Sequence, residues 1–285
     1  MRRGLPFLVI VAATLVLGGA IAGARLAGPP AAPAHYAFGH GPTIVMVHGL
    51  GSRIEHWLPV ARRLARTHRV VLVELPGHGE SEMPAPFTLA RVTECLDREL
   101  AAEDGPVVLV GHSVGGLVAA SVALRDPQRV RALVLVETVL RPTFDDAARR
   151  EIRAALDRDY TGTLRDVYRS FGRDSAQGDA LWGEVAPLDR AMMRQWIDLA
   201  LDTDLSRDAR RFAMPVLAVF AERNWPRDSS WSAVANDLGY AGTPQLEPAR
   251  FENCGHFVML DCPAALAARI AHFVDAPHGA LAARP

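Results

Sequence analysis

The sequence predicts an α/β fold in which a mostly parallel central sheet carries helices on both faces. From residue 43 onward, short and almost wholly apolar runs rich in β-branched residues alternate with helical stretches. Apolar runs without polar alternation are typical of strands buried on both faces, as in a parallel sheet. A chain of 285 residues is also long enough to bury such a core without disulfides or metals.

The individual elements follow from these runs and from the turn residues that bound them. The predicted strands are residues 43–49, 70–77, 106–112, 131–137 and 215–222. The predicted helices are residues 57–66, 89–102, 114–124 and 263–275. Alternation of this kind is typical of right-handed strand–helix–strand crossovers.

The alternation of strands and helices stops after Glu137. Residues 141–212 carry helical patterns rich in aromatic side chains and methionine, and they contain no convincing strand. Most of these side chains are expected to form helix core, and the functional alternative is an inserted lid that walls an apolar pocket. We therefore divide the body into a core (42–140 and 213–276), a helical cap (141–212) and a tail (277–285).

The amino terminus predicts export. Arg2 and Arg3 precede an uncharged run over residues 4–24, which as a helix would span roughly 30 Å, about one hydrocarbon core. A signal peptide cleaved after Ala24 and an uncleaved membrane anchor both fit, and the length of the run favours the anchor. Either way the body would be exported, as a membrane-anchored or a periplasmic or secreted protein. Residues 25–41 are rich in Ala, Pro and Gly and predict a tether without helix or core.

The composition excludes several kinds of chemistry. The net charge is −1, which gives little global attraction for nucleic acid, so we expect no nucleic-acid partner. The sequence contains no lysine, so all 31 basic residues are arginine. Schiff-base chemistry, a P-loop lysine and Ser–Lys dyads are therefore excluded.

The three cysteines leave two interpretations open. In an exported protein, Cys254 and Cys262 could form a disulfide. The interpretation we favour is that Cys95, Cys254 and Cys262 are small buried apolar side chains. No CxxC pair or His/Cys cluster has the spacing of a zinc site, so we expect no metal.

The strongest motif is Gly111-His112-Ser113-Val114-Gly115, a G-x-S-x-G sequence between a predicted strand and a predicted helix. A turn this tight requires a strained backbone at the serine and small residues on both sides of it. Ser113 is therefore expected to project at the carboxyl edge of the sheet as a nucleophile. The start of the following helix favours negative charge there.

With this motif, residues 42–276 resemble the α/β-hydrolase superfamily. The further matching motifs are HGLG at 48–51, LPGHGES at 75–81 and CGHF at 254–257. The resemblance implies the α/β-hydrolase fold with an inserted helical cap. It also implies that His256 is the base that activates Ser113, in the chain order serine, acid, histidine.

The resemblance also implies an oxyanion hole formed by the backbone N–H groups of Leu50 and Val114. Trp57 is a candidate for substrate binding, with a core or surface position as the alternative. His112 and His48 are expected to be structural, with His48 bracing the loop that carries Leu50.

The acid departs from the superfamily's common pattern. The usual aspartate position, after the strand at 215–222, is Asn224 in this chain. Glu137 is our first candidate, because it ends a strand where haloalkane dehalogenases carry their acid. Asp228 and Glu222 are local alternatives, and Asn224 itself could be a neutral orienter. The likeness to dehalogenases ends at the nucleophile, which is aspartate in those enzymes.

These expectations converge on a serine hydrolase with a small or medium apolar substrate that carries a carboxylic ester or a related acyl bond. It would need no cofactor. Lactonases, carbon–carbon bond hydrolases and perhydrolases of the same superfamily remain alternatives, and the oligomeric state stays open. A membrane-tethered binding protein without catalysis is the alternative from another class, motivated by Asn224.

Overall fold

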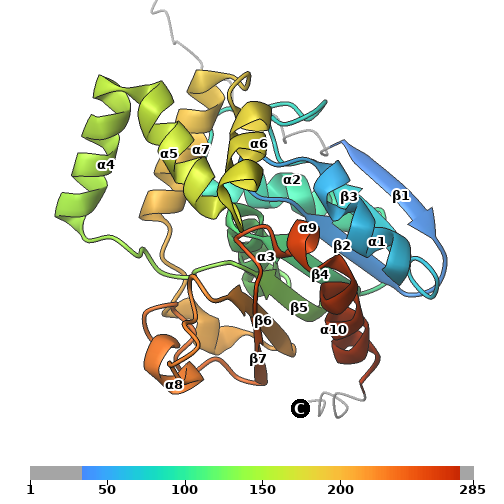
Figure 1. Ribbon diagram of the computed structural model, residues 1–285. Helices are drawn as coiled ribbons and strands as arrows, with labels where there is room; N and C mark the ends of the chain where they lie inside the picture. The colour runs from blue at the N-terminus through green and yellow to red at the C-terminus, as the bar shows by residue number, and fades with distance from the viewer. Residues whose placement is uncertain (1–33, 277–285) are drawn as a thin grey trace, which may run out of the picture.

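The computed structural model describes residues 34–276, which contain one sheet of seven strands (Figure 1). In spatial order these are β1 (His35–Gly39), β3 (Arg69–Val73), β2 (Thr43–Val47), β4 (Val107–His112), β5 (Val130–Val136), β6 (Val216–Ala221) and β7 (Leu246–Phe251). All neighbouring pairs are parallel except β1 with β3. The predicted mostly parallel sheet is therefore confirmed.

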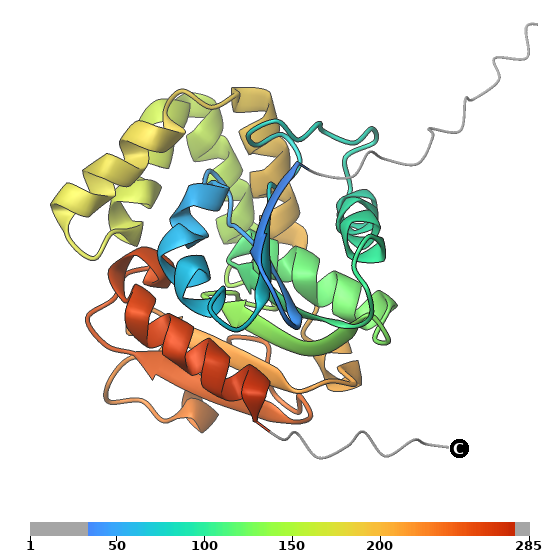
Figure 2. The same ribbon diagram turned by 90° about the vertical axis from the view of Figure 1, so that its right-hand side faces the viewer.

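Helices cover both faces of this sheet, as the apolar runs predict. Helices α1 (Leu58–Leu64) and α10 (Pro263–Asp275) pack against each other on one face, and a 3₁₀ turn, η1 (Ile54–Trp57), leads into α1. Helices α2 (Leu89–Ala101) and α3 (Val114–Arg125) pack on the other face (Figure 2). Every residue of β4 and β6 is buried, which agrees with burial on both faces.

Between β5 and β6 the chain forms four helices, α4 (Asp146–Arg158), α5 (Tyr160–Phe171), α6 (Ser175–Val185) and α7 (Arg190–Asp202), and the 3₁₀ turn η2 (Asp208–Arg211). The four helices gather above one end of the sheet (Figure 1). Each begins after an aspartate whose side chain accepts a hydrogen bond from a backbone N–H of the first turn: Asp145, Asp159, Asp174 and Asp189. Such caps satisfy N–H groups that have no partner within the helix.

Two strands correct the sequence analysis. The prediction of a tether over residues 25–41 is wrong at its end, because β1 pairs along its whole length with β3. Strand β7, which pairs with β6, is absent from the predicted elements. Both lie at the edges of the sheet, where a half-exposed strand such as LEPARF shows no continuous apolar run. Two short helices, α8 (Trp231–Val234) and α9 (Val258–Asp261), flank β7 along the chain.

The predicted export segment (1–24), the first part of the tether and the tail (277–285) lie outside the described residues. Within residues 34–276, no helix has the length and apolar character needed to cross a bilayer.

Candidate active site

Ser113 occupies the bend between β4 and α3. Its backbone has φ 52° and ψ −123°, a strained conformation for a residue with a side chain. The flanking glycines allow the bend: a Cβ on Gly111 would lie 2.4 Å from Gly116 Cα, and a Cβ on Gly115 would lie 2.1 Å from the His48 carbonyl oxygen. The sharp strand-to-helix turn that the motif predicts is therefore present.

His256 and Glu137 are paired at the same edge of the sheet. Nδ1 of His256 donates to Oε2 of Glu137 over 2.9 Å, and both side chains are almost completely buried. Glu137 follows directly on β5 and has a positive φ of 51°, so its backbone is strained like that of Ser113. Ser113, Glu137 and His256 all line one cavity.

Two further donors hold the Glu137 carboxylate. The Ala221 N–H, at the end of β6, donates to Oε1 over 2.6 Å. The Asn224 side chain donates to Oε2 over 2.8 Å, so His256 and Asn224 share one oxygen atom. With these three donors the buried carboxylate is well satisfied.

The alternative acids do not reach this cluster. Glu222 pairs with Arg227. Asp228 is exposed, and neither acid lines the cavity. Among the carboxylates considered from the sequence, only Glu137 contacts His256 within residues 34–276.

The His256 ring is held from two further directions. Phe171, the last residue of cap helix α5, stacks on it with ring centroids 4.4 Å apart, and the Phe171 carbonyl accepts the His256 N–H over 2.9 Å. His112 Nε2 donates to the His256 carbonyl over 2.9 Å. Burial lowers the pKa of His112 well below its ordinary value, so this neutral ring serves as a structural support, as expected.

The loop that carries Leu50 is fixed by hydrogen bonds to its peptide groups. The Gly49 carbonyl accepts from Ser52 N–H over 3.1 Å and from His48 Nδ1 over 2.8 Å. Because a trans peptide is planar, these bonds also fix the opposite direction of the Leu50 N–H. Leu50 lines the cavity, as does Val114, whose N–H begins α3 and has no acceptor within the helix.

The next peptide group is held from both sides. Its carbonyl, on Leu50, accepts from the Tyr168 hydroxyl of cap helix α5 over 2.8 Å. Its N–H, on Gly51, donates to His78 Nε2 over 3.0 Å. Burial lowers the pKa of His78 to about 3, which keeps the ring neutral and leaves Nε2 free to accept. Neither Tyr168 nor His78 is among the site residues predicted from the sequence, because only the fold brings them to this loop.

The cavity has a volume of about 320 Å³ and is walled largely by the cap. Apolar side chains from α5 and α7 form much of the wall: Leu164, Val167, Tyr168, Phe171, Ile197, Ala200 and Leu201. This wall agrees with the alternative of an inserted lid over an apolar pocket, whereas Met193 and Trp196 of α7 lie in the hydrophobic core, as expected for most of these side chains. Trp57 corrects another expectation, because its side chain is fully buried in the hydrophobic core and does not line the cavity.

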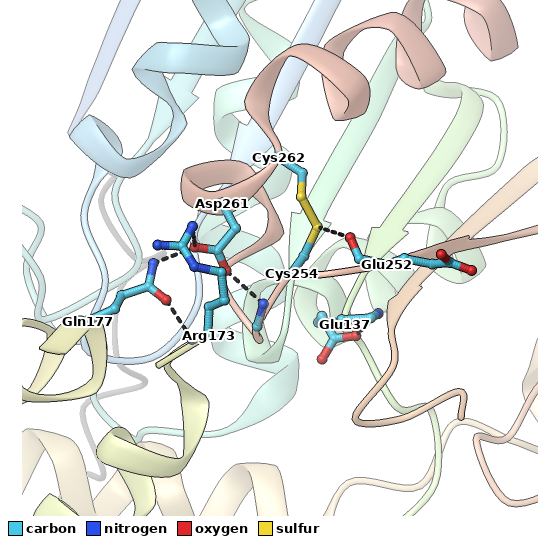
Figure 3. The surroundings of a disulfide bond; sticks show 9 residues. Glu137, Arg173, Gln177, Glu252, Cys254, Asp261 and Cys262 are labelled. Atoms are coloured by element: carbon cyan, nitrogen blue, oxygen red, sulfur yellow. Dashed lines mark hydrogen bonds and ion pairs between the residues drawn. A yellow bond between two sulfur atoms is a disulfide. The ribbon is translucent and has the colours of Figure 1, made fainter. Parts of the chain in front are cut away.

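Cys254 and Cys262 form a disulfide that closes the loop containing His256 (Figure 3). The interpretation of both as free buried thiols is therefore wrong, although Cys95 is free and buried. Helix α9 folds this segment back and brings the two Cα atoms to 6.3 Å, within the usual range for a disulfide. In the same loop, Asp261 accepts from Gly255 N–H over 2.7 Å and from Gln177 of cap helix α6 over 2.5 Å (Figure 3).

Known proteins share this fold. Residues 44–269 match a family described as the Alpha/beta hydrolase family. The chain belongs to this family. Because the match covers most of the chain, it spans the sheet apart from the edge strand β1, and also the helices of the cap in this alpha/beta hydrolase.

Two relatives and one solved structure are similar to this alpha/beta hydrolase. A pimeloyl-[acyl-carrier protein] methyl ester esterase of Nitrosomonas europaea is 31% identical over 244 residues, 79% of this chain and 92% of that protein. A protein of the same name from Pseudoalteromonas atlantica is 41% identical over 102 residues, 35% of this chain and 38% of that protein. A hydrolase of Oleispira antarctica superposes with a TM-score of 0.74 at 17% identity, covering 85% of this chain and 94% of that one, which shows the shared fold.

Proposed function

We propose that this alpha/beta hydrolase is a serine carboxylesterase. The observation that carries the proposal is the His256–Glu137 pair, which borders the same cavity as Ser113 on its strained bend. The resemblance of the Ser113 and His256 motifs to the family, and the ester hydrolysis named for the relatives, support the same conclusion.

In the proposed reaction, Ser113 Oγ attacks the carbonyl carbon of the ester while His256 Nε2 takes the hydroxyl proton. The tetrahedral intermediate collapses when His256 returns that proton to the departing alcohol, which leaves an acyl group on Ser113. Water, deprotonated by His256, then attacks the acyl carbon. The bond between that carbon and Ser113 Oγ breaks, His256 returns the proton to Oγ, and the carboxylic acid leaves. Glu137 fixes the orientation of the imidazole and offsets the positive charge that forms on it.

The negative charge of the intermediate rests on the N–H groups of Leu50 and Val114 in this proposal. The fixed peptide group between Gly49 and Leu50 supports this role for Leu50, because its N–H has a set direction before substrate binds. Asn224 has the role of a neutral orienter of Glu137.

The proposed substrate is a carboxylic ester with a small or medium apolar part. The apolar wall and the volume of the cavity support this class. The relatives named as pimeloyl-[acyl-carrier protein] methyl ester esterases suggest that methyl esters of medium-chain acids belong in any substrate panel.

Export of the protein is a further part of the proposal. It rests on the basic and apolar residues 1–24 and is supported by the Cys254–Cys262 disulfide, since disulfides persist in oxidising compartments. The apparent size of the protein in membrane and soluble fractions distinguishes an uncleaved anchor from a cleaved signal peptide.

A fluorophosphonate probe tests the esterase proposal. The folded protein should be labelled, and the labelling should disappear in Ser113→Ala. Ser121→Ala is the matched control, because Ser121 lies further along α3, where its hydroxyl donates to the Leu117 carbonyl. This variant should remain labelled. An unlabelled but folded protein would favour the non-catalytic alternative. A panel of esters of increasing acyl length then defines the substrate.

A further inference from the structure

Two arginines line the catalytic cavity. Arg141 follows β5 and Arg223 follows β6, and these strands are parallel neighbours in the sheet. Both arginines therefore lie on loops at the carboxyl edge, where Glu137 and Asn224 also lie. They bring two full positive charges to a cavity whose cap wall is apolar.

Neutral acceptors hold both guanidinium groups. Arg141 Nη1 donates to the Asn236 carbonyl over 2.9 Å. Arg223 Nη1 donates to the carbonyl and hydroxyl oxygens of Ser170, over 2.7 and 3.1 Å, and its Cζ lies 5.1 Å from the centre of the Phe171 ring. Such contacts fix the position of a guanidinium group without neutralising its charge.

No carboxylate of residues 34–276 lies within ion-pair distance of either group. The one acid in the cavity, Glu137, is already bound by three donors. Asp204, whose pKa Arg141 helps to lower, accepts two hydrogen bonds from Ser206. Arg153 of the cap differs from these two arginines, because its guanidinium group donates to the carboxylates of both Asp198 and Asp202.

We infer that the substrate of this site is an ester that carries an anionic group, a carboxylate or a phosphate, at a distance from the ester bond. The inference rests on the proposed esterase function and narrows its substrate class. Arg141 and Arg223 bind the anion with the N–H groups that their neutral partners leave free, because planar guanidinium donors match the oxygens of both anions. The apolar wall from α5 and α7 contacts the hydrocarbon between the two ends.

Matched methyl esters test this inference. The first is the monomethyl ester of a straight-chain dicarboxylic acid, and the second is the methyl ester of the alkanoic acid of equal chain length. The purified full chain should show a kcat/KM about tenfold higher or more for the anionic ester, as expected for a charge-assisted hydrogen bond. Because both arginines border open cavity, added salt should reduce this preference.

Arg141→Gln and Arg223→Gln should each lower the ratio of the two kcat/KM values about tenfold. Arg165→Gln removes the same charge from an exposed site on α5 outside the cavity, and it should leave the ratio unchanged. Far-ultraviolet circular dichroism confirms that each variant is folded. A third ester, with a phosphonate in place of the distal carboxylate, shows which anion the arginines prefer.

A wild-type protein that hydrolyses the neutral ester as efficiently as both anionic esters would overturn the inference and leave the esterase proposal standing. The inference would also be overturned, with the esterase proposal still standing, if the ratio of the two kcat/KM values were the same in the wild type, Arg141→Gln and Arg223→Gln. If no ester were hydrolysed in a Ser113-dependent manner, the proposed function would fail and the inference with it.

Discussion

Oε2 of Glu137 lies 2.9 Å from Nδ1 of His256, although 119 positions separate the two residues in the chain. The carboxylate reaches the histidine from the end of β5, and Asn224, after β6, donates to the same oxygen atom. In the pattern common in the family, the acid follows the strand equivalent to β6. Here the carboxylate, Glu137, follows β5, and the neutral Asn224 occupies the position after β6. This arrangement leads to two predictions.

Glu137→Gln should reduce kcat by about three to four orders of magnitude, because an amide can hold the wrong tautomer of His256 and cannot offset its positive charge. Ester hydrolysis under saturating substrate measures the effect. Asp228→Asn removes an exposed carboxylate from the loop after β6 and should have no effect. The opposite result, in which Asp228→Asn abolishes turnover and Glu137→Gln does not, would show that the acid is misassigned.

Moving the carboxylate to the other strand should restore part of the lost activity. Asn224→Asp alone places a second carboxylate against Glu137 and should destabilise the fold by about 1–3 kcal/mol, since a donor is lost and like charges meet. In the double variant Glu137→Gln/Asn224→Asp the repulsion is gone and one carboxylate remains in the cluster. Its kcat should exceed that of Glu137→Gln. Equal values for the two would mean that position 224 has no access to His256.

Tyr168→Phe should lower kcat about three- to tenfold with little change in KM, because one hydrogen bond that fixes the Leu50–Gly51 peptide is lost. Tyr160→Phe is the matched control, since Tyr160 lies at the start of the same helix and does not line the cavity. Steady-state kinetics on one ester separate kcat from KM. A rise in KM alone would instead assign Tyr168 to substrate binding.

Reduction of the Cys254–Cys262 disulfide, or its replacement in Cys254→Ser/Cys262→Ser, should lower the unfolding free energy by about 2–3 kcal/mol, as estimated from the closure of a loop this short. Turnover should also fall, because the loop contains His256. Urea unfolding with and without reductant measures the first effect. Cys95→Ser should show the same response to reductant as the wild type, since Cys95 is free.

Stability should decrease on acidification because of His78. Burial lowers the pKa of this ring to about 3, whereas an unfolded histidine titrates near 6.5, so the unfolded chain binds the additional proton. The contribution of His78 is fully present above pH 6.5 and is lost as the pH falls toward 3, at about 1.4 kcal/mol per pH unit.

Urea unfolding between pH 7 and pH 4 checks this slope. His78→Gln should flatten it, and His272→Gln, on the exposed side of α10, should not. Identical slopes in the wild type and His78→Gln would contradict the assignment.

The strongly periodic parts of the fold are predictable from sequence, and the weakly periodic edges are not. Buried parallel strands require apolar side chains on both faces, so β2 to β6 are visible as continuous apolar runs. Strands β1 and β7 lie at the edges of the sheet, where one row of backbone groups and part of each side chain meet solvent. Their composition therefore resembles that of loops.

The candidate site shows a similar division. The bend at Ser113 imposes small residues at fixed spacing, and Glu137 ends a strand that points it toward the same edge. No backbone bend or strand end fixes the position of Trp57 at this edge of the sheet, and its indole is buried in the core. Contacts such as Tyr168 with Leu50 join residues 118 positions apart, and local periodicity contains no information about them.

The cap of this enzyme also supplies part of the machinery beneath it. Tyr168 holds the loop that contains Leu50, and Phe171 supports both the ring and the backbone of His256. A chimera that exchanged residues 141–212 for the equivalent helices of another family member would lose these supports together with the old pocket wall. Engineers who wish to change substrate range by transplanting caps should therefore retain α5, or carry its two aromatic positions into the graft.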